Sequence, residues 1–195
     1  MDCWVFEMAT WEVHNRWAKK LIGGISETDL NLVNRLIDFP EEVDEFLEFF
    51  AETSNWFPEW KKMVPNFPLD EDYVRKIVLS EDELDKKLRR QLLHVAHDAG
   101  RSGQPLGGQR YRGLAAFVQL KFLSSKGSDH VKAWYLHHFI DFVTSSPRTD
   151  VKEKIERIEE RTGVPGFTRP EFEEEKSFFE RNFDAIAHDL NQEKS

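Results

Sequence analysis

The chain has 195 residues and a formal net charge of −9, so it is long enough to bury a substantial core and too acidic to bind nucleic acid nonspecifically over its whole surface. Its single cysteine, Cys3, excludes an intrachain disulfide and the cysteine-rich zinc motifs, and it favours a reducing compartment, with the cytoplasm as the default. No stretch approaches the ~18 consecutive apolar residues of a membrane span, and the N-terminus lacks the apolar run of a signal peptide, so no membrane association is expected.

Apolar residues recur at helical spacing along most of the sequence, and the alternation typical of strands is nowhere sustained. The predicted fold is therefore all-α, with residues 1–195 forming a single-domain helical bundle of about seven or eight helices. In chain order, a first helix ends at Gly23 and Gly24, a second is capped by Ser26 with Asp29, and a third begins at Pro40. Further helices are expected over residues 81–99, 114–123, 131–143 (capped by Ser128 or Asp129), 150–158 and 170–191, the last packed on the bundle through one apolar side.

Residues 54–70 interrupt the helical pattern, because Pro58, Pro65 and Pro68 break any continuous helix. Trp56 and Trp60 make the segment too apolar for a simple linker. A partner-binding patch is one interpretation of these aromatic residues, and burial over helix ends is the favoured one. A packed loop is therefore predicted.

The segment from Lys86 to Gly113 differs from the rest of the chain in charge and in backbone chemistry. It contains seven of the 27 lysines and arginines, one acid and five of the ten glycines. Its charge is therefore +6 within a chain of −9. Charge of one sign gathered beside a glycine-rich loop indicates an anion site.

The helix over residues 81–99, capped by Ser80 with Glu83, places a basic face opposite its leucine stripe. Guanidinium groups bind phosphate through two hydrogen bonds, and histidines add hydrogen bonds near neutral pH. We therefore predict a noncatalytic binding or regulatory protein that holds an anionic partner, either nucleic acid (RNA or DNA) or an acidic protein surface. A solvated basic face is the alternative. The predicted ligand-binding residues are Arg90, His94, His97, Arg101, Arg110 and Arg112.

Two short patterns in this segment resemble enzyme signatures. Arg89 with His94 fits R-x4-H, and Arg90 with His97 fits R-x6-H, both of which resemble the signature of HEPN ribonucleases. This resemblance implies metal-independent RNA cleavage, often at the interface of a homodimer. The run HDAGR at residues 97–101 resembles the HDxGK core of HD-domain phosphohydrolases, in which adjacent His and Asp bind a metal, although Arg101 stands where Lys is common.

The order of landmarks along the chain resembles that of heme-oxygenase-like proteins. The landmarks are His14 in the first helix, the run LGGQ at residues 106–109, and Trp134. The resemblance implies an oxidoreductase in which His14 ligates heme iron and glycines let a helix approach the heme. A helical enzyme is therefore the alternative to a binding protein, either this oxidoreductase or a HEPN-like ribonuclease that uses Arg89 and His94. The cofactor is left open.

A second group of polar residues lies on the helix expected over residues 131–143. His137 and Asp141 are one turn apart, so they could ligate a metal with help from another helix. A hydrogen-bonded His and Asp pair is the favoured interpretation. The sequence therefore predicts no metal site.

Overall fold

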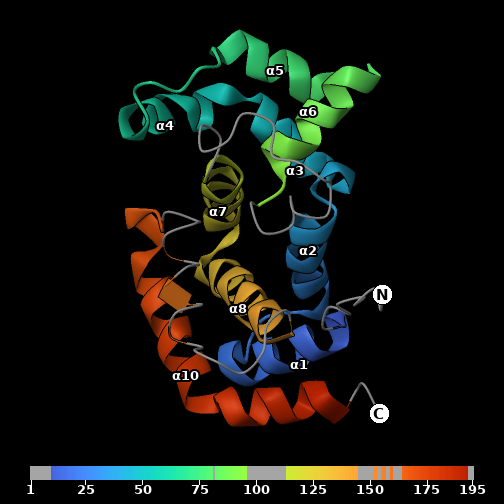
Figure 1. Cartoon of the computed structure of the whole chain (residues 1–195), viewed down its shortest axis with the longest axis vertical. Helices are drawn as coiled ribbons and strands as arrows, with labels where there is room; N and C mark the ends of the chain where they lie inside the picture. The colour runs from blue at the N-terminus through green and yellow to red at the C-terminus, as the bar shows by residue number, and fades with distance from the viewer. Residues whose placement is uncertain are drawn as a thin grey trace, which may run out of the picture. The chain divides into compact units, whose positions relative to one another are not determined.

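The computed structural model describes residues 10–80, 82–95, 113–144 and 164–192, together with residues 152, 155, 156 and 159. All regular secondary structure in these ranges is helical, which confirms the all-α prediction (Figure 1). The same ranges form nine α-helices, close to the expected seven or eight: α1 (Trp11–Ile22), α2 (Glu27–Asp38), α3 (Asp44–Ala51), α4 (Phe57–Met63), α5 (Glu71–Leu79), α6 (Glu83–Leu93), α7 (Leu114–Lys126), α8 (Ser128–Thr144) and α10 (Arg169–Gln192). They also contain the short 3₁₀ helices η1 (Pro40–Glu42), η2 (Thr53–Asn55) and η5 (Gly166–Thr168). No helix among the described residues is long and apolar enough to cross a membrane.

Contacts between residues divide the chain into two compact units. The first unit contains α1, α2 up to Asn34, α8 and α10. The second contains the end of α2 from Arg35 and helices α3 to α7. Each unit buries its own apolar side chains. The organisation of residues 1–195 as one domain stays a prediction.

Helix α8 is the centre of the first unit, and both α1 and α10 pack on it (Figure 1). The C-terminal helix expected over residues 170–191 is α10, whose ring of Phe179 lies 5.4 Å from that of Phe139 in α8. The buried apolar residues of α10 recur at intervals that place them on one side of the helix: Phe172, Phe179, Ile186 and Leu190. Helix α10 therefore covers α8 with its apolar side.

Interactions between neighbouring residues set the C-terminal end of α1 and the start of α2, as the sequence predicts. Gly23 ends α1 with a φ of 66°, a conformation that favours glycine, and its N–H donates to the carbonyl of Lys19 at 3.1 Å. Ser26 precedes α2, and its Oγ accepts a hydrogen bond from the backbone N–H of Asp29 at 3.1 Å. The predicted stop and the predicted cap are both confirmed.

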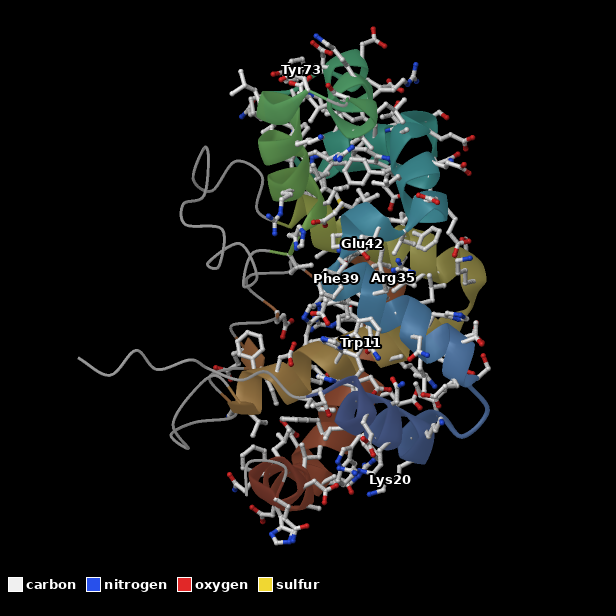
Figure 2. All side chains as sticks on the ribbon, turned by 90° about the vertical axis from the view of Figure 1, so that its right-hand side faces the viewer. Trp11, Lys20, Arg35, Phe39, Glu42 and Tyr73 are labelled. Atoms are coloured by element: carbon white, nitrogen blue, oxygen red, sulfur yellow. The ribbon has the colours of Figure 1, made fainter. Side chains whose placement is uncertain are left out.

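Helix α7 is buried on nearly every side in the second unit, where α3 and α6 pack against it. The ring of Phe122 in α7 lies 5.5 Å from that of Phe46 in α3, in an edge-to-face arrangement. At the turn between α2 and η1, Arg35 and Glu42 form an exposed ion pair at 3.2 Å (Figure 2). Aromatic side chains of α7 and α3 thus pack against each other in the core of this unit.

The segment 54–70 is packed, as expected, but it is not a loop throughout. Trp56 and Trp60 are buried, and the indole N–H of Trp56 donates to the carbonyl of Phe50 at 3.0 Å. Residues 57–63 form α4, because Pro58 lies in the first turn of the helix, where a backbone N–H has no helical partner to lose. Helix α5, which is not among the expected helices, follows from Asp70, whose side chain accepts from the N–H of Tyr73 at 2.7 Å.

The long helix predicted over residues 81–99 begins later and ends earlier in the structure, so both predicted ends are wrong. Helix α6 begins after Asp82, whose carboxylate accepts from the N–H of Leu84 at 2.8 Å, so Asp82 takes the capping role assigned to Ser80. The helix ends at Leu93, and His94 has an extended backbone with ψ of 140°. The carbonyl of Leu93 accepts a hydrogen bond at 2.9 Å from the buried side-chain amide of Gln119 in α7. In a longer helix, a backbone N–H would have donated to this carbonyl instead. A continuous helical face from Arg90 to His94 and beyond is therefore not formed.

Candidate metal centre

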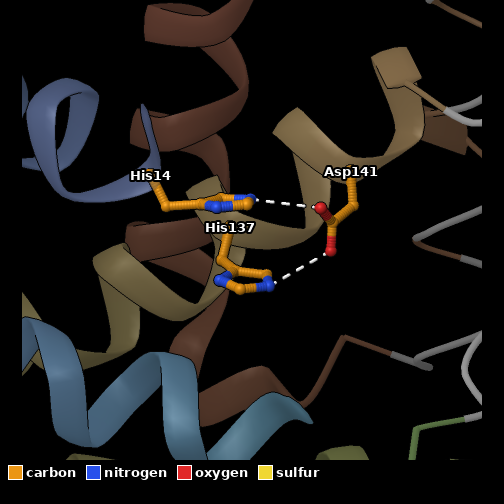
Figure 3. Close-up of side chains that lie close together, drawn as sticks. All are labelled: His14, His137 and Asp141. Carbon is orange, nitrogen blue, oxygen red and sulfur yellow. Dashed lines mark hydrogen bonds and ion pairs between the residues drawn. The ribbon is translucent and has the colours of Figure 1, made fainter. Parts of the chain in front are cut away.

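Three side chains that can each bind a metal ion meet in the first unit: His14 of α1, with His137 and Asp141 of α8 (Figure 3). Their ligand atoms all lie within 4.8 Å of one another. The exposed fractions of the three residues are 3%, 2% and 6%, so water is largely excluded from the cluster. Polar side chains buried to this degree require partners that satisfy their charge and hydrogen-bonding groups.

Helix geometry and helix packing both contribute to the cluster. His137 and Asp141 share one side of α8 because they are one turn apart, and α1 brings His14 against them. The Nε2 atom of His14 lies 3.1 Å from Oδ1 of Asp141, and Nε2 of His137 lies 3.1 Å from Oδ2 (Figure 3). The two imidazole rings are stacked, with centroids 3.9 Å apart and planes 12° apart. One carboxylate therefore faces two histidines.

The other nitrogen of each ring has an oxygen acceptor of its own. Nδ1 of His14 lies 2.9 Å from the carbonyl oxygen of Thr10, and Nδ1 of His137 lies 2.9 Å from Oδ1 of Asn34. A carbonyl oxygen can only accept, so each Nδ1 carries a proton and donates it. In the neutral imidazole the lone pair is then on Nε2, directed at Asp141. Metal-ligating histidines in proteins show the same arrangement, with the second nitrogen donating to an oxygen outside the site.

Burial and the neighbouring charges set the protonation of the cluster. Burial lowers the pKa of His14, the charge of His137 lowers it further, and Asp141 opposes both effects. Burial disfavours ionisation of Asp141, but the charge and hydrogen bonds of the two histidines outweigh it and hold the pKa of this carboxyl well below its usual range. Positive charge on the side of the histidines thus keeps the Asp141 carboxylate ionised, whereas burial favours a neutral His14, in which Nε2 carries a lone pair. A bound cation can supply the positive charge beside Asp141 while His14 stays neutral.

Two imidazole nitrogens and a carboxylate are ligands that zinc, iron and other first-row transition metals accept. With metal–ligand bonds of about 2.0–2.2 Å, two ligand atoms of a tetrahedral site lie about 3.3–3.6 Å apart. The N to O separations of the cluster, 3.1 Å, are slightly shorter and equal those of hydrogen bonds, so the ligands must move apart slightly to hold an ion. An imidazole lone pair lies in the plane of its ring. A single ion bound by both Nε2 atoms therefore requires the stacked rings to tilt toward each other.

The predicted anion site is only partly described. Arg90 and His94 lie in the second unit, whereas His97, Arg101, Arg110 and Arg112 lie outside the described residues. His94 Nε2 contacts Oε2 of Glu41 at 2.8 Å, and Arg90 Nε lies 3.6 Å from Oε1 of the same carboxylate. The structure thus brings these two predicted residues together around an acid, Glu41, that sequence reasoning did not include.

The residues that carry the enzyme resemblances have other partners. Arg89 donates to the carbonyls of Val78 and Ser80 at the end of α5, both at 3.3 Å, while His94 faces Glu41. His14, the expected heme ligand, has its ring nitrogens directed at Thr10 and Asp141. The HDAGR and LGGQ runs, at residues 97–101 and 106–109, lie outside the described residues.

Sequence reasoning missed the cluster because its members are far apart in the chain. His14 precedes Asp141 by 127 residues, and only the packing of α1 on α8 brings them together. One signal was present: His137 and Asp141 lie among the apolar residues of α8 that are buried, and buried polar residues require a partner.

No family model matches the sequence, no curated protein matches it, and no solved structure matches it. The function of the chain is therefore inferred from the geometry of its own site.

Proposed function

We propose that the chain is a metal-binding protein whose first unit holds one divalent transition-metal ion with His14, His137 and Asp141. One observation supports this above the others: both Nδ1 atoms donate to oxygen acceptors, so in the neutral form of each ring the Nε2 lone pair is directed at the same carboxylate. Three acceptor atoms that converge in a buried place form a cation site.

The alternative for these three residues is a set of hydrogen bonds with no ion. His14 would then have to donate from both nitrogens, to Thr10 and to Asp141, and only the imidazolium form can do this. Burial opposes that form, since it lowers the pKa of His14. A bound ion satisfies the same atoms while the histidine stays neutral, and for this reason we favour it.

Titration of the full chain with Co²⁺ and Zn²⁺ after treatment with a chelator tests the proposal. We expect one ion per chain, with visible absorption bands when Co²⁺ binds to nitrogen and oxygen ligands. Loss of a residue that only supports a metal ligand weakens metal binding by up to about 100-fold. Asp141→Asn and His14→Gln each remove a ligand, so each should weaken binding by more than this. Circular dichroism shows whether each variant is folded.

His188→Gln is the matched control, because His188 is an exposed histidine of α10 whose Nε2 lies 3.0 Å from the side-chain amide of Gln192. It should bind Co²⁺ as the wild type does. Absence of saturable binding by the wild-type chain, or equal binding by a folded Asp141→Asn variant, contradicts the proposal.

An anionic macromolecule held by the second unit is a second candidate function, and the exposure of Arg90 favours it. The Arg90 side chain is 59% exposed although its Nε lies 3.6 Å from Glu41. The Glu41 side chain is 25% exposed, and an ion pair that solvent reaches contributes only about 0–1 kcal/mol, so a phosphate or an acidic side chain can compete with Glu41 for this guanidinium. RNA, DNA and an acidic protein surface are the partners considered for this site.

Binding of a labelled single-stranded RNA at increasing salt tests this second candidate. The affinity should fall as salt rises, because phosphate contacts release counterions, and it should fall further in Arg90→Ala. Arg35→Ala is the control, since Arg35 is a similarly exposed arginine of the same unit paired with Glu42. Binding that does not depend on salt, or that is equally sensitive to both substitutions, contradicts a site at Arg90.

A further inference from the structure

Asn34 of α2 is a buried amide beside the proposed metal site, and its Oδ1 lies 2.9 Å from Nδ1 of His137. We infer that Asn34 is a positioning residue that fixes the proton of His137 on Nδ1 and thereby directs the Nε2 lone pair into the metal site. The inference rests on the proposed function. Asn34 contacts the ligand His137, and its effect on the ion is through that ligand.

The orientation of the Asn34 amide follows from a chain of hydrogen bonds that begins at the surface. Glu27 is an exposed carboxylate whose pKa is lowered by hydrogen bonds from Lys19 and Asn15, so it accepts hydrogen bonds. The side-chain group of Asn15 that faces Glu27 is therefore its NH₂, at 2.8 Å. The second hydrogen of this NH₂ is directed at Oδ1 of Asn31, at 3.0 Å.

The orientation of Asn15 then determines that of Asn34. Because the NH₂ group of Asn15 faces Glu27, its Oδ1 faces Asn34 and accepts a hydrogen bond from Nδ2 of Asn34 at 2.7 Å. The oxygen of Asn34 is left to face His137, and an amide oxygen can only accept. His137 must therefore carry its proton on Nδ1. At each hydrogen bond of this chain, the orientation of one side chain determines which atom of the next side chain faces it.

The location of this proton separates two possible roles of His137. In the neutral ring with its proton on Nδ1, Nε2 presents a lone pair and can ligate a metal ion. With the proton on Nε2, the ring would donate to Oδ2 of Asp141, which lies 3.1 Å away, and the two residues would form an ordinary hydrogen bond. Asn34 thus determines whether His137 serves as a metal ligand or as a hydrogen-bond donor to Asp141.

His14 provides an internal reference. Its Nδ1 donates to a backbone carbonyl, that of Thr10 at 2.9 Å, which no side-chain substitution removes. Variants of Asn34 should therefore change the proton position in His137 and leave that of His14 as it is.

Long-range ¹H–¹⁵N correlation spectra of the metal-free full chain locate the proton in each histidine ring and test the inference. In the wild type, both His14 and His137 should show protonated Nδ1 atoms. In Asn34→Leu, which removes the acceptor but keeps similar bulk, His137 should move to the form protonated at Nε2. In Asn34→Asp, which keeps an acceptor at the same place, Nδ1 of His137 should stay protonated. Asn31→Ala is the matched control, because Asn31 contacts Asn15 and should leave His137 as in the wild type.

Zinc titration of the same variants measures the effect on the ion. Asn34→Leu should bind Zn²⁺ about 10- to 100-fold more weakly than the wild type, and Asn31→Ala should bind as the wild type does. A folded Asn34→Leu chain in which His137 keeps its proton on Nδ1 overturns the inference. If Asn34→Leu does not fold, loss of the Nδ1 proton in Asn34→Asp overturns it.

The two readouts separate this inference from the proposed function. A wild-type chain that binds no zinc overturns the proposed function, and the spectra of the metal-free variants still decide the role of Asn34. Zinc binding by the wild type together with an unchanged His137 in Asn34→Leu supports the proposed function and rejects the role of Asn34.

Discussion

Glu175 of α10 is fully buried, and neither of its carboxylate oxygens has a hydrogen-bond partner within the described part of the chain. Burial raises the pKa of Glu175 to about 8, and the charges of Glu174 and Asp129 add to the effect while that of Lys132 opposes it. A carboxyl group in this environment is protonated at pH 7 in the folded chain. Protonation of Glu175 therefore contributes to the stability of the first unit.

The pH dependence of unfolding follows from this shift. The folded chain holds the Glu175 proton more tightly than the unfolded chain does, because its pKa rises from an ordinary value of 4.5 to about 8. The free energy of unfolding should then fall as the pH rises through this range and level off above it. Glu175→Gln stays neutral at every pH, so it should remove this slope and raise the free energy of unfolding at pH 9 by a few kcal/mol.

Urea unfolding at a series of pH values from 5 to 9 measures the effect. Glu180→Gln is the control, because Glu180 is an exposed residue of the same helix, and this variant should keep the slope of the wild type. A Glu175→Gln variant with an unchanged slope would show that Glu175 is ionised in the folded chain.

The element whose end depends most on tertiary structure is α6. The side-chain amide of Gln119 in α7 is fully buried and donates to the carbonyls of Leu93 at 2.9 Å and Leu36 at 3.2 Å. Gln119→Leu would leave two carbonyls without these donors, at a cost of about 1–3 kcal/mol each. We expect a loss of about 2–6 kcal/mol in the free energy of unfolding, measured in urea.

Gln192→Leu is the matched control for this substitution. Gln192 is an exposed glutamine at the end of α10, so its replacement by leucine should change stability by less than about 0.5 kcal/mol. Equal effects of the two substitutions would mean that the hydrogen bonds of Gln119 do not stabilise the fold.

Local sequence signals explain which elements could be predicted. Gly23 and the Ser26 cap act on their own backbone neighbours, so the end of α1 and the start of α2 were predictable. The end of α6 was not, since Gln119 acts on Leu93 from another helix, 26 residues later in the chain. The candidate metal site also has one part that was predictable and one that was not. The pairing of His137 with Asp141 follows from helix periodicity, whereas the contact with His14 follows from packing of α1 on α8.

At the scale of the whole molecule, an ion that binds only the folded chain must stabilise it. The free energy of unfolding rises by about 2.7 kcal/mol when the concentration of free zinc is 100 times the dissociation constant. For a chain of this length, we expect the melting temperature to rise by roughly 5–10 °C. Calorimetry with and without zinc measures the shift.

Asp141→Asn serves as the comparison for this thermal shift, because it removes the charge of the site at nearly constant volume. Its melting temperature should not respond to zinc, while that of His188→Gln should rise as in the wild type. A rise of the same size in Asp141→Asn would place the stabilising ion elsewhere in the molecule.

The stacked rings of His14 and His137 have a further consequence. At a centroid separation of 3.9 Å and an angle of 12°, each ring lies in the magnetic shielding region of the other, so the carbon-bound protons of both rings should resonate upfield of those of an exposed histidine. The tilt that coordination requires would reduce this shielding. Proton chemical shifts of two histidines would then report, without any added label, whether the cluster has closed around an ion.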